Sequence, residues 1–120
     1  MRENAIVHDW PRQMRKGFAE LCILIILSDG EDYGYSILSK MAKIEALSFS
    51  ESTLYPMLAK MTKQGLLKVR EGPSARGKTR RYYHMTTKAK ARLAELLVYW
   101  ESLRDGIELL ASPRQQSEES

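Results

Sequence analysis

Apolar positions near the start of the chain recur at intervals of three and four residues, which is typical of an α-helix. Residues 11–28 carry one stripe of apolar side chains at this spacing: Met14, Phe18, Leu21, Cys22 and Ile25. Further aliphatic residues fill the other faces, and a helix that is apolar nearly all round has to be buried on most sides. We predict a buried helix over residues 11–28, entered at Pro11, after an N-terminal arm over residues 1–10, which show no period.

Two shorter helical patterns follow the polar turn of residues 28–32. One face of residues 33–46 is apolar and consists of Tyr35, Leu38, Met41 and Ala42. Residues 50–65 direct a second apolar set inward: Leu54, Met57, Leu58 and Met61. Ser50 can cap the start of this second helix, and Gly65 can end it because glycine readily adopts a positive φ.

After Gly65 the period of the pattern changes from 3.6 to 2. Residues 66–72 and 80–86 are rich in β-forming residues and flank a loop, residues 73–79, that contains Pro, Ser and Gly. These segments predict a β-hairpin with a cationic tip. Because side chains alternate between the two faces of a strand, one of Tyr82 and Tyr83 should pack on the helices while the other faces outward.

The last long segment, residues 87–111, repeats apolar positions at alternating intervals of four and three, the heptad spacing of a helix that packs against another helix. The seam consists of Ala89, Leu93, Leu96, Trp100, Leu103, Ile107 and Leu110. We predict a dimerisation helix over residues 87–111 and a disordered polar tail over residues 112–120.

Three short helices, a two-stranded ribbon and a long helix, in this order, form the plan of a winged helix-turn-helix followed by a dimerisation helix. The predicted fold class is mainly α with a two-stranded β-hairpin (α+β), and the winged helix domain covers residues 11–86. A chain of 120 residues fits one such domain, whose core a partner would complete.

Positive charge is concentrated in one part of the chain. Residues 60–81 hold eight cations and one acid, whereas residues 1–59 hold six and eight, and residues 82–120 hold five and six. The formal net charge of +4 therefore arises from a single segment within a slightly acidic chain. A focused basic patch of this kind indicates a polyanionic partner.

The third helix of a winged helix enters the major groove, so its exposed small polar and cationic residues are the predicted contacts to double-stranded DNA. On this helix the candidates are Ser50, Ser52, Thr53, Tyr55, Pro56, Lys60 and Lys63. The early residues would face base edges while the lysines would reach phosphates. The wing contributes Arg76, Lys78, Thr79 and Arg80, and the second helix contributes Tyr35, Ser39 and Lys40. Arg81 is assigned to the strand edge.

The sequence has no pattern of catalytic or metal-binding residues. His8 and His84 lie far apart, Cys22 lies within an apolar helix, and no HxxxH, CxxC or glycine-rich phosphate loop occurs. We therefore predict no enzyme activity, no metal and no cofactor. No apolar run reaches the roughly 20 residues that span a bilayer, so a cytoplasmic protein without a membrane partner is expected.

Three motifs carry a resemblance to a known family. DYGYSIL at 32–38, STLYPMLAKMTKQGLL at 52–67 and GKTRRYYHMT at 77–86 together resemble the PadR-type transcriptional regulators. The resemblance implies a bacterial homodimer of the short type, in which the single C-terminal helix packs on the partner's first and last helices. Such regulators usually repress a promoter until an effector binds. The implied interface residues are Phe18, Leu21, Ile25, Leu93, Leu96, Trp100, Leu103, Ile107 and Leu110.

Some short members of the family place a Trp of the last helix at the dimer centre, where two copies flank a pore for flat aromatic compounds. Trp100 occupies the similar place in this chain. The resemblance therefore implies a small aromatic or phenolic effector, with Met14, Phe18, Leu97 and Trp100 as its site. Packing within the seam would also explain Trp100, so both interpretations stay open.

A symmetric dimer predicts a pseudo-palindromic operator with half-sites roughly one or two helical turns apart. The alternative is a winged helix that assembles proteins or binds RNA without binding an operator, because a fold alone does not settle a function.

Overall fold

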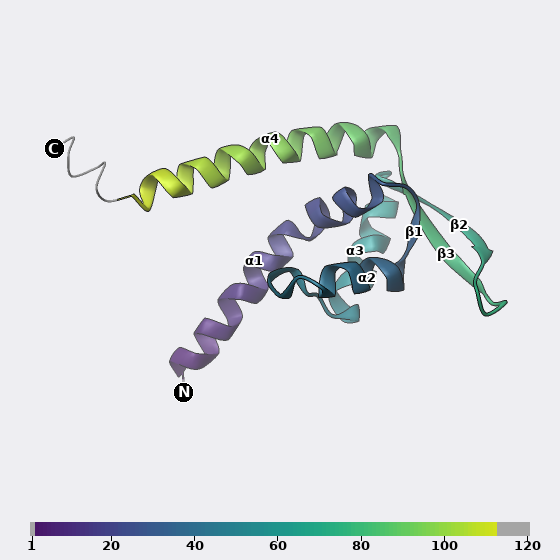
Figure 1. Cartoon of the computed structure of the whole chain (residues 1–120), viewed down its shortest axis with the longest axis horizontal. Helices are drawn as coiled ribbons and strands as arrows, with labels where there is room; N and C mark the ends of the chain where they lie inside the picture. The colour runs from purple at the N-terminus through teal and green to yellow at the C-terminus, as the bar shows by residue number, and fades with distance from the viewer. Residues whose placement is uncertain (1, 113–120) are drawn as a thin grey trace.

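A computed structural model of the chain describes residues 2–112, with side chains described for Pro11 and for residues 13–112. The elements follow in the order α1 (Arg2–Leu27), β1 (Asp32–Tyr33), α2 (Gly34–Ala42), a short 3₁₀ turn η1 (Glu45–Leu47), α3 (Glu51–Lys63), β2 (Leu67–Pro73), β3 (Thr79–Met85) and α4 (Thr87–Leu110). In Figure 1 the hairpin β2–β3 projects at one end of the molecule, beyond the helices. The fold is mostly helical with a small antiparallel sheet, as the sequence predicted.

The hydrophobic core lies where α1, α2, α3 and the sheet meet. Its fully buried side chains are Ile23, Leu24, Ile37, Met41, Leu54, Leu58, Met61, Leu66 and Leu67. On α1 the buried face consists of Ala19, Ile23, Leu24 and Leu27. The apolar stripe identified from the sequence is the other face of this helix: Met14 is 58% exposed and Ile25 is 44% exposed. The chain therefore buries one apolar face of α1 and leaves the second one open.

The predicted N-terminal arm is wrong, because α1 begins at Arg2 and Pro11 lies inside it. Proline lacks one backbone N–H, but its φ near −65° is that of a helix. A helix can therefore continue through Pro11 at the cost of one hydrogen bond and of crowding between the proline ring and the carbonyl four residues earlier, so proline does not have to mark the start.

The second helix is shorter than predicted, since α2 ends at Ala42 and η1 replaces its last turn. Its buried positions are Gly34, Ile37 and Met41, whereas Tyr35 is 63% exposed and Ala42 is also exposed. The buried face is displaced from the predicted one by about one position, because Tyr35 and Ala42 face outward although their side chains are apolar in part or in whole. Ile37 is the residue that points into the core.

The sheet has three antiparallel strands in the order β1-β3-β2, and β1 was not predicted. A strand of two residues is too short to show a period. Asp32 pairs with Tyr83 and Tyr33 pairs with Tyr82, while on the other side of β3 the same tyrosines pair with Val69 and Arg70. Tyr83 is 6% exposed and lies in the core, whereas Tyr82 is only partly buried and faces outward. This confirms the predicted division between the two tyrosines.

Thr86 connects the end of α3 to the start of α4. Gly65, with φ of +80°, ends α3, and its N–H and that of Leu66 donate to Thr62 O and Met61 O in the pattern of a Schellman motif. The Thr86 hydroxyl donates to Gly65 O at 2.7 Å and accepts from the N–H of Ala89 at 3.2 Å, which caps α4. Lys88 Nζ donates to Gln64 O at 2.8 Å. The carbonyls at the end of α3 thus receive donors from the start of α4.

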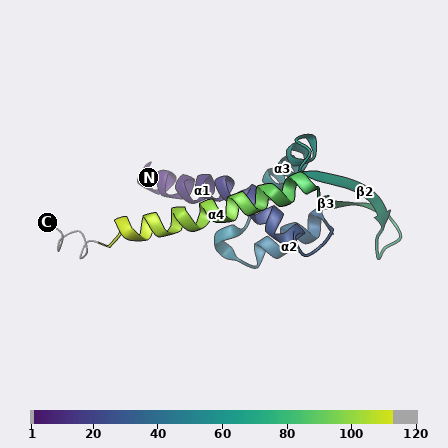
Figure 2. The ribbon, with the colours of Figure 1, turned by 90° about the horizontal axis from the view of Figure 1, so that it is seen from above.

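Helix α4 runs back over α1, toward the side of the molecule opposite the wing (Figures 1 and 2). In its first half Leu93 and Leu96 pack against the core, whereas Ile107 is 54% exposed and Leu110 is 73% exposed. The radius of gyration is 17.9 Å, while a compact chain of this length has about 14 Å. The seam is thus partly buried as far as Leu103 and exposed at Ile107 and Leu110. The predicted tail, residues 112–120, lies outside the described residues except for Ser112.

We expect Thr86→Val to lower the free energy of unfolding by about 1–2 kcal/mol, because the isosteric change removes both the cap of α4 and the donor to Gly65. Urea denaturation measures this free energy of unfolding. Thr87→Val is the matched control, since Thr87 is exposed and caps nothing. Equal losses in the two variants would contradict the role of the Thr86 hydroxyl.

Candidate nucleic-acid interface

Helix α3 presents most of the predicted DNA contacts on one exposed face. Leu54, Leu58 and Met61 are buried, which turns the remaining side chains outward. The residues that are exposed are Ser50, Ser52, Tyr55, Pro56, Lys60 and Lys63, and Thr53 is partly buried. At 1.5 Å per residue, Lys63 lies about 16 Å beyond Ser52 along the helix axis. The hydroxyl-bearing residues and the lysines therefore occupy opposite ends of α3.

A polar hollow surrounds the first turn of α3 and brings predicted and unpredicted residues together. Ser50 Oγ lies 2.9 Å from Ser52 Oγ and 3.2 Å from Thr53 Oγ1. The hollow is lined by these three residues and by Arg15, Lys16, Ser48 and Phe49. Sequence reasoning missed Arg15 and Lys16, because they belong to the slightly acidic first segment of the chain. Only the fold places these two cations beside the free N–H groups at the start of α3, which also attract anions.

A second hollow lies between the wing and the start of α2 and α3. It is lined by Tyr33, Gly34, Tyr35, Tyr55, Arg76, Arg80, Arg81 and Tyr83. Of the predicted contacts, it brings together Tyr35, Tyr55, Arg76 and Arg80. Arg81 was assigned to the strand edge, but the structure adds it to this lining. None of the described residues in the lining is acidic, so the hollow combines guanidinium and phenol groups without a competing carboxylate.

Tyr55 lies across the start of α2. A Cβ at position 34 would come within 2.5 Å of Tyr55 Cε1, so glycine is required for this close approach. Burial raises the pKa of the Tyr55 phenol, and the carboxylate of Glu51 raises it further. The hydroxyl therefore stays protonated at neutral pH and can donate a hydrogen bond to a phosphate or a base.

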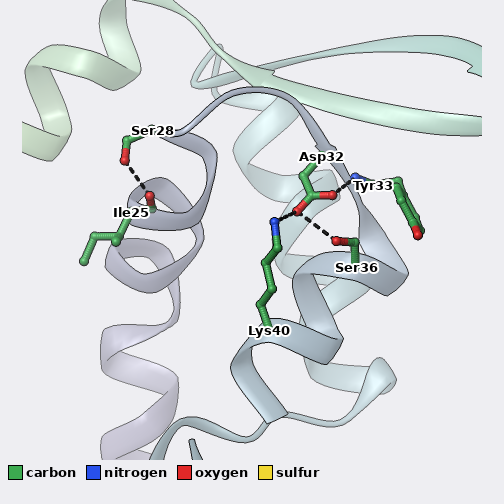
Figure 3. Close-up of polar contacts among 6 residues, drawn as sticks. All are labelled: Ile25, Ser28, Asp32, Tyr33, Ser36 and Lys40. Atoms are coloured by element: carbon green, nitrogen blue, oxygen red, sulfur yellow. Dashed lines mark hydrogen bonds and ion pairs between the residues drawn. The ribbon is translucent and has the colours of Figure 1, made fainter. Parts of the chain in front are cut away.

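Lys40 has a partner within the protein, which the sequence did not indicate. Its Nζ donates to Asp32 Oδ2 at 2.7 Å, and the same oxygen accepts from Ser36 Oγ at 3.0 Å (Figure 3). The other carboxylate oxygen accepts from the N–H of Tyr33 at 2.9 Å. The side chain of Lys40 is 52% exposed and that of Asp32 is 10% exposed. Lys40 thus compensates a buried charge, which limits its freedom to contact DNA, and its neighbour Ser39 is partly buried.

The wing tip leaves Arg76, Lys78 and Thr79 exposed, whereas Arg80 is partly buried. The guanidinium of Arg80 lies 3.8 Å from the centroid of the Tyr33 ring, which is the distance of a cation–π contact. Arg80 and Thr79 are therefore held by the sheet, in which Thr79 pairs with Pro73, while Arg76 and Lys78 lie in the loop.

The sequence model of the transcriptional regulator PadR-like family matches residues 23–95. This span contains all the residues of α2, α3 and the wing that line the two hollows. The chain belongs to the PadR-like family of transcriptional regulators.

Solved structures of PadR-like proteins resemble this fold along most of the chain. A PadR-family transcriptional regulator from Eggerthella lenta is 28% identical, with a TM-score of 0.80 over 93% of this chain and 97% of that one. A PadR-like transcriptional regulator from Bacillus cereus is 36% identical, with a TM-score of 0.76 over 83% and 97%. Bacillus subtilis PadR, solved in complex with operator DNA, is 30% identical, with a TM-score of 0.60 over 66% of this chain and 45% of that one.

In this PadR-like chain an apolar hollow of about 530 Å³ lies between α1, η1 and the middle of α4. Phe18 and Trp100 meet there edge to face, with ring centroids 5.4 Å apart. The lining contains all four predicted effector contacts, Met14, Phe18, Leu97 and Trp100. It also contains Leu21 and Ile25 of α1 and Ala46 and Leu47 of η1. A neighbouring hollow is lined by Leu96 and Leu103 as well. Burial raises the pKa of the Cys22 thiol, which also lines the first hollow.

Among the described residues of the PadR-like chain, no group of three or more His, Cys, Asp and Glu side chains could hold a metal ion. His8 lies outside the described side chains. None of the helices described is long and apolar enough to cross a membrane.

We expect a double-mutant cycle of Asp32→Asn and Lys40→Gln to give a coupling of about 1 kcal/mol in urea denaturation, since either change alone breaks the ion pair. The control cycle uses Asp29→Asn and Lys43→Gln, two exposed residues of the same region that do not pair. Coupling in the control as large as in the Asp32 cycle would contradict a specific role for the pair.

Proposed function

We propose that this chain is a homodimeric DNA-binding repressor that releases its operator when a small aromatic or phenolic effector binds. The single observation that supports DNA binding best is that two cation-containing hollows adjoin the first turns of α3. One surrounds the first turn of α3 and the other lies under the wing. Such a regulator would act in the cytoplasm, where bacterial DNA lies.

Within this proposal the polar residues at the start of α3 and the cations of the two hollows have separate tasks. Ser52, Thr53 and Tyr55 near the start of α3 would meet base edges, because the first turns of a recognition helix point into the major groove. The arginines of the wing hollow would contact phosphates, since a planar guanidinium can donate two parallel hydrogen bonds to one phosphate. Arg15 and Lys16 would add a phosphate contact beside the first turn of α3. Bacillus subtilis PadR, a related protein, was solved in complex with operator DNA, which supports DNA binding as the proposed function.

The homodimer is proposed because the second half of α4 has no core of its own. Val98, Tyr99, Ile107, Leu109 and Leu110 are each more than half exposed, and so is Met14 on the open face of α1. Apolar surface of this extent on a small domain indicates an interaction site. A second copy, placed by a two-fold axis, would cover the face made of Phe18, Leu21, Ile25, Leu93, Leu96, Trp100, Leu103, Ile107 and Leu110. The two-fold symmetry in turn predicts a pseudo-palindromic operator.

The effector site is proposed for the hollow between α1 and α4. Its volume of about 530 Å³ lies within the roughly 300–1,000 Å³ typical of small-molecule sites. Its walls offer flat aromatic faces from Phe18 and Trp100, and flexible contacts from Met14 and Leu97. Ala46 and Leu47 of η1 reach the same space. A bound ligand would therefore touch the turn that immediately precedes α3, which supplies a physical route from effector to DNA.

We expect operator binding to weaken steeply with salt, with a slope of about −0.9 per phosphate contacted and roughly 6 to 10 contacts per dimer. Arg76→Gln removes one contact from each protomer, so it should reduce the slope by about 2 and weaken operator and unrelated DNA alike, whereas Thr53→Val should cost about 1–3 kcal/mol on the operator alone. Mobility shift against the promoter of its own gene measures both. Lys90→Gln, which removes an exposed cation from α4, is the control. A flat salt dependence, or equal competition by duplex RNA, would contradict operator binding.

We expect phenolic acids or flat aromatic compounds to quench the fluorescence of Trp100 in a Trp10→Phe background. Phe18→Ala should weaken this binding about tenfold, because a well-packed aromatic wall is lost. Val98→Ala is the control, as Val98 lies on α4 but does not line the hollow. Sedimentation shows whether each variant remains dimeric. Absence of quenching by a broad aromatic panel would remove the effector proposal and leave Trp100 as a packing residue.

A further inference from the structure

Five side chains form a continuous row across the outer face of the sheet, and none of the functions above uses it as a unit. Glu31 pairs with Arg70, Arg70 lies 4.6 Å above the Tyr82 ring, Tyr82 meets Tyr33 edge to face at 5.8 Å, and Arg80 lies 3.8 Å above Tyr33. We call this set, in the order Glu31, Arg70, Tyr82, Tyr33 and Arg80, the cation–aromatic row. It begins before β1 and ends on the wing strand that carries Arg80.

The first contact of the row is directional. Arg70 donates to both carboxylate oxygens of Glu31, through Nε at 2.8 Å and through Nη2. A two-pronged contact of this kind fixes the plane of the guanidinium, which a single ion pair does not. The Arg70 contact holds the pKa of Glu31 below its usual range, so the carboxylate is ionised at neutral pH.

The middle of the row is fitted to β2. A Cβ at position 72 would lie 2.4 Å from Arg70 Nη1 and 3.2 Å from Tyr82 Cε2, so the glycine leaves space for both side chains. Tyr82 also donates from its hydroxyl to Pro73 O at 2.8 Å, near the end of the strand. The ring of Tyr82 is therefore positioned by β2 on one side and by Tyr33 of β1 on the other.

The row meets the helix-turn-helix through β1. Side chains alternate along a strand, so Tyr33 lies in the row while Asp32 points to the other side and contacts Ser36 and Lys40 of α2 (Figure 3). Three consecutive residues, 31–33, thus connect the wing and α2 by side-chain contacts on both faces of one strand. Any change in the angle of the wing relative to α2 has to break contacts on one of these faces.

We propose that Glu31, an acidic residue without a DNA contact of its own, is a positioning residue for DNA binding. Through Arg70, Tyr82 and Tyr33 it sets the direction of the wing and hence the place of Arg80 relative to α3. The inference rests on the proposed DNA binding. It also makes Arg70 a residue whose planar, two-pronged contact matters more than its charge.

Simple electrostatics predicts the opposite effect for the loss of this carboxylate. Removing one negative charge beside a basic surface should strengthen the binding of a polyanion. Glu71→Gln supplies that reference, because Glu71 is exposed on β2 next to Arg70 and lies outside the row. Positioning by Glu31 therefore predicts changes of opposite sign for two variants with the same change in net charge.

The experiment compares operator binding by Glu31→Gln, Glu71→Gln, Arg70→Lys and Gly72→Ala in the full chain. Glu71→Gln should bind as tightly as the parent or more tightly. The other three should each bind roughly fivefold more weakly, although Arg70→Lys keeps the charge and Gly72→Ala changes none. Operator binding by Glu31→Gln at least as tight as by Glu71→Gln, or wild-type binding by Arg70→Lys, would overturn the proposal.

A second readout needs no DNA. Amide hydrogen exchange at the rung of the hairpin where Gly72 pairs with Arg80 should accelerate on the order of fivefold in Glu31→Gln and stay unchanged in Glu71→Gln, with the same midpoint of thermal unfolding. Unchanged hydrogen exchange in Glu31→Gln would overturn the proposal that Glu31 positions the wing through the cation–aromatic row. If exchange accelerates but no variant and no parent binds duplex DNA, the proposed function fails while the positioning of the wing stands.

Discussion

The pairing of β1 with β3 is the interaction on which the arrangement of the wing, α2 and α3 depends. Only two residues, Asp32 and Tyr33, form β1, yet they bring α2 against the wing strand. The buried carboxylate of Asp32 receives three donors, which is the condition for tolerating a charge at such a position. Because α2 starts at Gly34, directly after this strand, the register of β1 also decides where Gly34 meets Tyr55 of α3. Wing, second helix and third helix are therefore mutually placed by one short strand.

Thr86 has the corresponding role on the other side of the domain. It caps α4 and donates to the end of α3, so the long helix leaves the domain in a direction set by the helix that is proposed to contact DNA. The ion pair of Arg92 with Glu20, at 2.9 Å, fixes α4 a second time, against α1. Two helices with different proposed tasks thus share one polar connection, which allows a change at α4 to be transmitted to α3.

Periodicity was sufficient for the elements and insufficient for the contacts between them. The hairpin, α3 and α4 were predicted within a few residues, because each shows a sustained period, and α3 is also bounded by Ser50 and Gly65. The strand β1 and the contact between Lys40 and Asp32 were missed, since both depend on residues that have no period and become neighbours only through folding. The same reason applies to Arg15 and Lys16, whose place beside α3 is a property of how α1 packs. The distribution of charge along the sequence identified the wing cations but did not indicate Arg15 and Lys16.

The least buried part of the helix-turn-helix is η1, which contains no buried residue. It lies between α2 and α3, and Ala46 and Leu47 face the apolar hollow rather than the core. Segments with few buried contacts open at low free energy, so η1 is where the smallest perturbation would move the first turn of α3. The hollow is walled on its other sides by α1 and α4, whose side chains pack against the core in part. A ligand that enlarges this space would therefore displace η1 before it displaces either long helix, and Ser50, at the N-cap position of α3, follows η1 by only three positions.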